Sequence, residues 1–424
     1  MMILTSTRLA RLLLRCGIAA ASIGAVSPTA SAQWTVTNLH PAGTLLSTCY
    51  GVGGGQQAGY VQVGPTVGDS RASLWSGTAA SWVNLHPAGT GYSFAYGADG
   101  GQQVGEYIPA GFARAALWSG TAASWVDLHP AGPTESSALG IGDGQQVGRT
   151  SLGGFNAALW SGTAASWVNL NPPPNPITGY SHSSEAYGVG GGQQVGYVVA
   201  DGGVISASLW SGTAASWVNL HPVGVGADIS QAFGTDGLQQ VGIARIMSTT
   251  VVAASLWSGT AASWVNLNPA GVSTGRANAV HGGQQVGRTT VSGVSRACLW
   301  SGSAASWVDL HAFLPAGFTS SEATGISHVG GITYVVGYGF NGLTVRTEAL
   351  LWVRSAPPFC AGDFDGDNAV TNADLPGFVA ALLAGGVCPV PPATCPGDMN
   401  ADGIVDGADI PGFLAKILAG GACP

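Results

Sequence analysis

The chain has 424 residues, a formal net charge of −8 and only 8% charged residues, whereas 46% of its residues are hydrophobic. Disordered chains are usually highly charged and poor in aromatic residues, so this composition excludes a largely disordered protein. The sequence contains no basic cluster that could neutralise phosphate groups, and we therefore expect no nucleic-acid partner. The 67 glycines suit many tight turns between short strands, which predicts a mainly β protein.

The first 32 residues have the features of a secretory signal peptide. Three arginines form a positively charged leader, at Arg8, Arg11 and Arg15. A short apolar run follows at residues 16–26, and the small residues 30–32 form a cleavage pattern. An apolar run of about 11 residues is too short to span a bilayer, and no later segment has the length of a transmembrane helix. The sequence therefore predicts a signal peptide at 1–32 and a secreted or extracellular protein, with attachment to the cell surface left open.

Residues 33–355 consist of seven copies of one unit. The unit combines a Trp-Val-Asn-Leu-His-Pro segment, a Ser-x-Ala-x-Gly segment, a Gly-Gln-Gln-Val-Gly segment and an Ala-x-Leu-Trp-Ser-Gly-Thr segment. The Leu-Trp pairs end at Trp75, Trp118, Trp160, Trp210, Trp257, Trp300 and Trp352. The copies differ in length between these segments, as insertions in surface loops would make them do.

Each copy is expected to form four short strands, because apolar runs alternate with glycine-rich turns. Four strands in about 45 residues match one blade of a β-propeller, and a blade must stack on its neighbours to bury both faces. The region begins at residues 34–41 with half of a recurring hairpin and ends at residues 351–353 with the other half. A first strand that completes the last blade would pair both ends. We therefore predict a seven-bladed β-propeller over 33–355, with an open β-solenoid as the alternative.

Two segments show a recognisable pattern, the unit at residues 136–148 and the triplet His311-Ala312-Phe313 before Leu314. In these segments the region 34–355 resembles the extracellular HAF-repeat family. That family has no well-defined activity. The resemblance therefore implies an extracellular repeat protein and no particular reaction.

Histidine recurs at one position of the unit, but its pattern does not indicate catalysis. The residues are His40, His86, His129, His221 and His311. The same position holds Asn171 and Asn268 in the two other copies. Asn can cap a turn as His does, but it cannot act as a general base, so we predict a capping role.

The glutamates of the repeats also argue against catalysis, because we interpret them as lying at unlike positions of the unit. They are Glu106, Glu135, Glu185, Glu322 and Glu348. Glycoside hydrolysis needs two carboxylates about 5–10 Å apart, and no such pair is expected.

Tryptophan and cysteine in the repeats are predicted to be core residues. The two tryptophans of each copy, such as Trp75 and Trp82, could form a sugar-stacking surface. Their recurrence in nearly every copy favours a core between blades, because aromatic side chains dominate core burial. Cys49 and Cys298 replace small residues of other copies, and we expect buried free thiols.

Residues 360–424 form a second, shorter duplication, joined to the repeats by a linker at 356–359. Each half begins with acidic residues at alternate positions, and alternate oxygen donors on a tight loop can surround Ca²⁺ with six to eight oxygens. The predicted ligands of the first loop are Asp363, Asp365, Asp367, the carbonyl of Ala369, Thr371 and Asp374. Those of the second loop are Asp398, Asn400, Asp402, the carbonyl of Ile404, Asp406 and Asp409. The sequence therefore predicts two calcium ions.

A helix should follow each calcium loop, over 375–383 and 410–418, because Pro lies in its first turn and Gly lies beyond its end. The apolar side chains expected to pack the halves together are Phe378, Leu382, Phe413 and Leu414. At the sharp turn of the second loop lies Gly403, whereas the first loop has Asn368 there, so the first calcium site is expected to be the weaker one.

The loops, helices and Gly-Gly-x-Cys-Pro ends make residues 360–424 similar to a dockerin, a calcium-dependent module that docks onto cohesin domains. The paired cysteines match the form seen in planctomycete-type secreted proteins. The resemblance implies a cohesin-like or envelope protein as partner, bound through loop positions 10 and 11. These positions differ here from the familiar Ser-Thr and are Asn372, Ala373, Gly407 and Ala408. In an exported chain of this kind we expect the disulfides Cys360–Cys388 and Cys395–Cys423.

These patterns favour a secreted, non-catalytic protein whose propeller presents a binding or structural surface and whose tail docks in a calcium-dependent manner. The alternative is a polysaccharide-binding or polysaccharide-degrading component, because dockerins often accompany glycoside hydrolases. Paired carboxylates in a lined central pocket would favour the enzyme.

Overall fold

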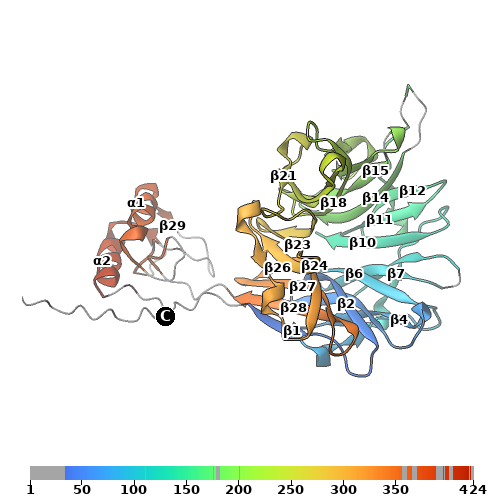
Figure 1. Ribbon diagram of the computed structural model, residues 1–424, viewed down its shortest axis with the longest axis horizontal. Helices are drawn as coiled ribbons and strands as arrows, with labels where there is room; N and C mark the ends of the chain where they lie inside the picture. Colours follow the sequence, from blue (N-terminus) through green and yellow to red (C-terminus); the bar gives the residue numbers. More distant parts are fainter. Residues whose placement is uncertain are drawn as a thin grey trace, which may run out of the picture. The chain divides into compact units, whose positions relative to one another are not determined.

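The computed structural model describes residues 34–109, 111–174, 176–177, 182–199, 201–355, 361–364, 370–387, 395, 397–400, 404–419 and 421. These residues belong to two compact units, the repeat unit within residues 32–356 and the C-terminal unit within residues 357–424 (Figure 1). The predicted signal peptide and the predicted linker lie outside the described residues.

The repeat unit consists of groups of four antiparallel strands that follow one another along the chain. The first group is β2 (Leu46–Gly53), β3 (Gln56–Gln62), β4 (Ser70–Trp75) and β5 (Val83–Asn84). The second is β6 (Ser93–Asp99), β7 (Gln102–Tyr107), β8 (Arg114–Trp118) and β9 (Val126–Asp127). The third is β10 (Ser136–Gly142), β11 (Gln145–Ser151), β12 (Phe155–Trp160) and β13 (Val168–Asn169).

The next two groups are joined into one eight-stranded sheet by a parallel contact of Ile205 with Ile229. The fourth group is β14 (Ser183–Gly190), β15 (Gln193–Val199), β16 (Ile205–Trp210) and β17 (Val218–Asn219). The fifth is β18 (Ala227–Thr235), β19 (Gln240–Ile246), β20 (Val251–Trp257) and β21 (Val265–Asn266). The sixth group is again separate and is β22 (Gly275–His281), β23 (Gln284–Val291), β24 (Val294–Trp300) and β25 (Val308–Asp309).

The last group combines strands from both ends of the repeat unit. Its strands are β26 (Phe318–Val329), β27 (Ile332–Asn341), β28 (Arg346–Ser355) and β1 (Thr35–Asn38). The N-terminal strand β1 pairs antiparallel with β28, with Val36 opposite Trp352, and these strands lie together in Figure 1. The first and last strands of the region therefore share one sheet.

The recurring Ser-Gly-Thr-Ala-Ala-Ser segment forms a short 3-10 turn between the third and fourth strands. In the first group the turn is Ala79–Ser81, and the Ser81 hydroxyl accepts from the Ser76 N–H at 2.8 Å. The Gly77 N–H donates to the side chain of Gln57 at 2.7 Å. Matching turns are Ala122–Ser124, Ala164–Ser166, Ala214–Ser216, Ala261–Ser263 and Ala304–Ser306. The predicted hairpin turn is therefore confirmed.

The tryptophan at the end of each third strand fills the interface between neighbouring groups. Trp118 has no exposed surface and packs against Ala58, Leu74 and Leu85 of the preceding group. Trp75 lies in the same way in a cluster with side chains of β28 and β27, so that the first group packs on the last. The prediction of a core role is confirmed for these tryptophans, whereas the second tryptophan of the first copy, Trp82, is only partly buried. Burying side chains of this size is a large stabilising contribution.

The Gly-Gln-Gln segments link neighbouring groups through buried amides. The second Gln of each pair is fully buried, and in the second group the Gln103 amide donates to the side chain of Gln56 in the first group at 3.0 Å. The same contact recurs between Gln285 and Gln239 at 2.8 Å. Because buried polar groups must be paired, this contact explains why Gln recurs at both positions.

The C-terminal unit contains two short helices that follow its two loops. α1 (Leu375–Ala384) and α2 (Ile410–Leu418) each have Pro in the first turn, and both predicted helices are confirmed. The rings of Phe378 and Phe413 stack between them with centroids 3.9 Å apart. Leu382 packs on this cluster, whereas Leu414 is 49% exposed, so the prediction that Leu414 packs the halves together is wrong.

The two halves of the C-terminal unit make reciprocal backbone contacts. β29 (Gly386–Val387), which follows α1, pairs with β30 (Ile404–Val405) in the second loop. Conversely, Val370 in the first loop donates its N–H to the Gly421 carbonyl beyond α2 at 2.7 Å. Each loop is thus tied to the segment that follows the other half's helix. Among the described residues of the chain, no helix is both long and apolar enough to cross a membrane.

Candidate functional site

A β-bulge interrupts the first strand of every group and sets apart one residue. In the first group the register of β2 against β3 jumps from Cys49 to Gly51, which leaves Tyr50 without an opposite residue. The same jump occurs in the Ser-x-Ala-x-Gly segment of all seven groups. The residues set apart are Tyr50, Tyr96, Leu139, Tyr187, Phe233, Asn278 and Thr324. Bulges commonly redirect a side chain, which makes these residues a candidate site.

The sequence requires glycine where the bulge forms. A Cβ on Gly59, the last residue of the Gly-Gln-Gln-Val-Gly segment, would run into the Thr48 carbonyl of the bulged strand. A Cβ on Gly51 would lie 2.6 Å from the Cα of Gly97 in the next group. The first clash explains the recurring glycine of the second strand. Because Gly51 has no Cβ, the first strands of the first two groups can approach each other this closely.

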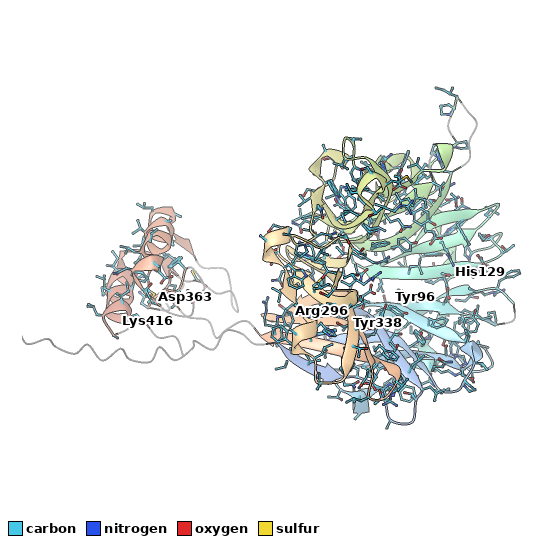
Figure 2. The ribbon with its side chains drawn as sticks, viewed as in Figure 1. Tyr96, His129, Arg296, Tyr338, Asp363 and Lys416 are labelled. Carbon is cyan, nitrogen blue, oxygen red and sulfur yellow. The ribbon has the colours of Figure 1, made fainter. Side chains whose placement is uncertain are left out.

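All seven bulge residues line one cavity of about 740 Å³. The first strands of all seven groups therefore line this cavity, which we call the axial cavity. Tyr96 and Tyr338, which both line it, come from opposite ends of the repeat region, and Figure 2 shows both toward the middle of the repeat unit. A concave site that combines apolar walls with a few polar groups is typical of small-ligand pockets.

Aromatic rings form much of the wall of the axial cavity. The ring of Tyr50 lies 5.7 Å from that of Tyr96 and 6.3 Å from that of Tyr338. Further along, the Tyr187 ring lies 5.5 Å from that of Phe233. These separations are within the usual range for interacting aromatic pairs, so the rings support one another.

Glutamates lie beside the bulge residues and are held by donors. Glu322 receives the hydroxyl of Tyr338 at 3.1 Å and forms an ion pair with Arg288 at 3.2 Å. Glu185 receives the hydroxyl of Tyr197 at 3.0 Å and pairs with Arg149 at 3.1 Å. Of these six residues, Glu322, Tyr338 and Arg288 line the axial cavity.

The prediction that the glutamates occupy unlike positions is wrong for Glu185 and Glu322. Both follow the buried serine of the Ser-x-Ala-x-Gly segment, at Ser184 and Ser321, and so hold one position of the unit. The sixth group has Arg276 at this position. Alignment on the serine and alanine would have revealed the correspondence.

The tyrosines of this region are held in the neutral form. Burial, followed by the charge of Glu322, raises the pKa of Tyr338, and burial followed by Glu185 raises that of Tyr197. Burial also raises the pKa of Tyr50 to about 12. Neutral phenols donate hydrogen bonds, so the hydroxyls of Tyr338 and Tyr197 keep their carboxylates engaged at physiological pH.

Arg276 is a second arginine of the wall and differs from Arg288 in its partners. Its guanidinium lies 3.6 Å from the centroid of the Phe233 ring, and its Nε donates to the Asn278 side chain. Among the described residues no carboxylate lies within ion-pairing distance of it. Burial is the main effect that lowers its pKa, with the charge of Glu322 opposing the shift.

Three aspartates also line the axial cavity where the first strands end, Asp99, Asp143 and Asp236, and two of them hold backbone N–H groups of turns. The Asp143 carboxylate accepts the Gly191 N–H of the next group at 2.7 Å. Asp236 accepts the Gln239 N–H in its own turn at 2.8 Å. The described residues contain no group of three or more His, Cys, Asp or Glu side chains that could hold a metal ion.

The recurring histidines have the predicted structural role. The His129 N–H donates to Asp127 at 2.8 Å, and its ring Nδ1 lies 2.8 Å from the Ser136 hydroxyl. That hydroxyl in turn accepts the Ala115 N–H at 2.9 Å. Asn171 replaces the ring in the third group, where it accepts the Ser184 hydroxyl at 2.7 Å. The position therefore ties the end of one group to the first strand of the next.

Cys49 and Cys298 are buried free thiols, as predicted. For the C-terminal disulfides, Cys360, Cys388 and Cys423 lie outside the described residues, so both pairings stay predictions. Of the predicted calcium ligands, Asp365, Asp367, Ala369 and Asp402 also lie outside them. The partner-binding residues Asn372, Ala373, Gly407 and Ala408 are exposed, at the turns that precede the two helices.

The last predicted ligand of each calcium loop is a buried carboxylate. Asp374 accepts the N–H groups of Phe364 at 2.6 Å and Thr371 at 2.8 Å. Asp409 accepts those of Met399 at 2.7 Å and Asp406 at 2.9 Å. The Oδ1 of Asp409 also accepts the Asn400 N–H at 3.2 Å. Both carboxylates are therefore held by backbone N–H groups of their own loops.

No family of known proteins matches this sequence, and no curated protein matches it. Among solved structures, puromycin hydrolase is similar at 11% identity and a TM-score of 0.47, over 76% of this chain and 56% of that one. A puromycin-hydrolyzing peptidase of Mycobacterium tuberculosis has 15% identity and a TM-score of 0.43, over 76% and 56%. The β-propeller domain of the Trilobed protease from Pyrococcus furiosus has 8% identity and a TM-score of 0.42, over 73% and 93%. The chain thus spans little more than half the length of the first two.

These matches contradict the predicted non-catalytic protein that only presents a surface. The similar structures are largely peptidases, or the propeller domain of a protease. The likeness is one of fold and assigns no peptidase activity to this chain.

Proposed function

We propose that the repeat unit is a closed seven-bladed β-propeller that binds a small polar ligand in its axial cavity. The observation that carries this proposal is the β-bulge, which recurs in all seven groups and turns one side chain of each toward the same cavity. The proposed site therefore lies in the cavity that the seven first strands line.

Closure of the ring is supported at two places. β1 pairs with β28, and Trp75 of the first group packs on Val336 and Leu351 of the last. An open β-solenoid, the alternative from the sequence, would hold its first and last repeats apart. The seven groups of four strands support a count of seven blades.

The chemistry of the wall indicates the class of ligand. Tyrosine and phenylalanine rings offer flat apolar faces, whereas tyrosine hydroxyls, amides and arginines offer polar contacts in fixed places. Pockets of this composition bind small organic molecules, with the polar groups setting their orientation.

Filling the cavity tests the proposal. Leu139 is a bulge residue without polar partners to lose, so Leu139→Trp should occupy cavity volume and abolish ligand-induced thermal stabilisation of the full chain. The matched control is Leu152→Trp, at a side chain that is 52% exposed outside the cavity. We expect the control to behave as the parent protein in a thermal-shift screen of small organic molecules. Ligand stabilisation that survives Leu139→Trp would contradict the axial site.

For the C-terminal unit we propose two calcium sites and a cohesin-like protein partner. The buried carboxylates of Asp374 and Asp409 support the calcium sites. Each helix also carries an exposed apolar stripe that starts beside the predicted docking residues. The stripes are Leu375, Val379 and Leu383 on α1, and Ile410, Leu414 and Leu418 on α2, with 41% to 86% of each side chain exposed. Binding of a purified cohesin domain to the full chain, measured with and without EDTA, tests the partner. Equal binding under both conditions would refute calcium-dependent docking.

A further inference from the structure

We infer that the ligand of the axial cavity carries a carboxylate group and that Arg276 binds it. This inference rests on the proposed ligand-binding function and names the chemistry of that same site. It starts from the charge on one stretch of the wall, where β22, β23 and β26 meet.

This stretch of wall has one positive charge in excess. Arg276 on β22 lies directly opposite Arg288 on β23 in the antiparallel register, which places two like charges on neighbouring strands. Glu322 on β26 is the nearby carboxylate, and it forms its ion pair with Arg288 at 3.2 Å. Like charges directly opposite one another destabilise a sheet, and a half-buried cation without a counter-charge is unfavourable. An anion in the cavity would relieve both effects.

The guanidinium of Arg276 is positioned to receive that anion. One face stacks on the Phe233 ring at 3.6 Å, and Nε is engaged by Asn278. The Asn278 amide is held in turn by Glu322 at 2.9 Å, so the plane of the guanidinium is fixed. In the described part of the chain, the two terminal nitrogens of Arg276 have no hydrogen-bond or ion-pair partner. They are donors on a residue that lines the cavity.

A carboxylate matches these donors in geometry and in charge. Arginine binds planar, two-oxygen anions through parallel hydrogen bonds, and such charge-assisted bonds are stronger than neutral ones. One carboxylate would pair with Arg276, whereas a phosphate dianion would be repelled more strongly by Asp99, Asp143 and Asp236 elsewhere in the wall. The tyrosine rings around the cavity suit a flat or ring-shaped body attached to the carboxylate.

Two sources of such a carboxylate can be separated with matched probes. N-acetylphenylalanine represents a peptide C-terminus, and its amide is the neutral counterpart. Glucuronate represents a sugar acid, and glucose is the neutral counterpart. We expect one of the two acids to bind the full chain at least tenfold more tightly than its counterpart in calorimetric titration at constant ionic strength.

Variants locate the contact. Arg276→Gln should weaken binding of that acid at least tenfold and leave the neutral counterpart unaffected. The control is Arg245→Gln, because Arg245 pairs with Asp228 at 2.6 Å on an exposed surface away from the cavity; this variant should bind as the parent does. Arg276→Lys should restore only part of the affinity, since a lysine keeps the charge and loses the planar pair of donors.

The outcomes distinguish the inference from the function on which it rests. The acid and its neutral counterpart could bind equally well, with binding lost in Leu139→Trp and kept in Arg276→Gln. This result would overturn the inference that the ligand carries a carboxylate, but it would still support a ligand site in the axial cavity. Acid binding that survives Leu139→Trp overturns the axial site itself. Failure of both acids to bind at millimolar concentration also overturns the inference for these two sources.

Discussion

The two units both arise from repetition, but they use it in opposite ways. In the repeat unit the recurring residues build the fold, as the buried Trp and Gln do, whereas the cavity chemistry lies at positions that vary from group to group. In the C-terminal unit the recurring residues are themselves the proposed ligands, and Asp374 and Asp409 have the same backbone partners in the two halves. The proposed function therefore lies at positions that vary among the copies in one unit and at positions that recur in the other.

The largest effect on stability should come from replacing a recurring glycine of the repeat unit. A Cβ at Gly148 would run into the backbone carbonyl of Ser137 in the bulge, which cannot move without disturbing the first strand. We expect Gly148→Ala to lower the free energy of unfolding by more than about 3 kcal/mol. Urea denaturation followed by tryptophan fluorescence measures it.

The matched control is Gly68→Ala, where the nearest atom, the Thr66 hydroxyl, would lie at 3.5 Å. This control should stay within about 1 kcal/mol of the parent protein. A Gly148→Ala variant as stable as the control would show that the bulge tolerates a side chain, and the division between fold residues and cavity residues would then fail.

The features that were predictable from the sequence are those that recur. Trp, the His or Asn capping position and the hairpin turn are visible as repeats, so their structural roles could be predicted by comparing copies. The cavity residues could not be, because a bulge changes which side of a strand a residue faces, and alternation along Ser-x-Ala-x-Gly does not reveal it. Tyr50 and Asn278 are unlike in chemistry, and only the structure shows that they hold the same place.

Two predictions were wrong, one on the positions of the glutamates and one on the burial of Leu414, and both concern features that do not recur in every copy. The shared position of Glu185 and Glu322 is hard to recognise because glutamate is rare there, although serine and alanine flank it in most groups. Helix periodicity allows Leu414 in the core. However, the described part of this unit has two short helices, and with Phe378 stacked on Phe413 that face of α2 is exposed. Small domains bury little of their surface, so apolar periodicity overestimates their core.

A smaller effect should separate the two proposed calcium loops. Asp398→Ala removes the first ligand of the second loop, and the calorimetric stoichiometry of the full chain should fall from two calcium ions to one. At a calcium concentration one hundred times the dissociation constant, losing a site should lower the stability of this unit by about 2.7 kcal/mol.

Asp363→Ala is the matched variant in the first loop. It should also remove one ion, but the weaker one, because Asn368 stands where the second loop has Gly403. Unchanged stoichiometry in either variant would refute the assignment of that loop. Loss of the tighter site in Asp363→Ala would reverse the predicted order of affinities.

The smallest effect concerns the contact between neighbouring groups at the recurring histidine. Burial, and next the charge of Arg114, lowers the pKa of His129 below its usual value near 6.5. The unfolded chain then binds more protons than the folded chain, so stability should be complete above pH 6.5 and should fall as the pH drops toward the folded pKa. Burial acts in the same direction on His40, His86 and His311.

His129→Asn isolates this effect, because Asn171 already accepts a serine hydroxyl at the equivalent position. The Ser136 hydroxyl accepts the Ala115 N–H and can donate its single hydrogen to neutral His129, and protonation of the ring removes that acceptor. An asparagine oxygen keeps the acceptor at every pH. We expect the variant to match the parent in urea midpoint at pH 7.5 and to lose less stability at pH 5, by about 0.5–1.5 kcal/mol, the usual net contribution of one hydrogen bond. Equal acid sensitivity of the two proteins would mean that the histidine contact contributes nothing to joining the groups, and that the recurring residue is retained there for another reason.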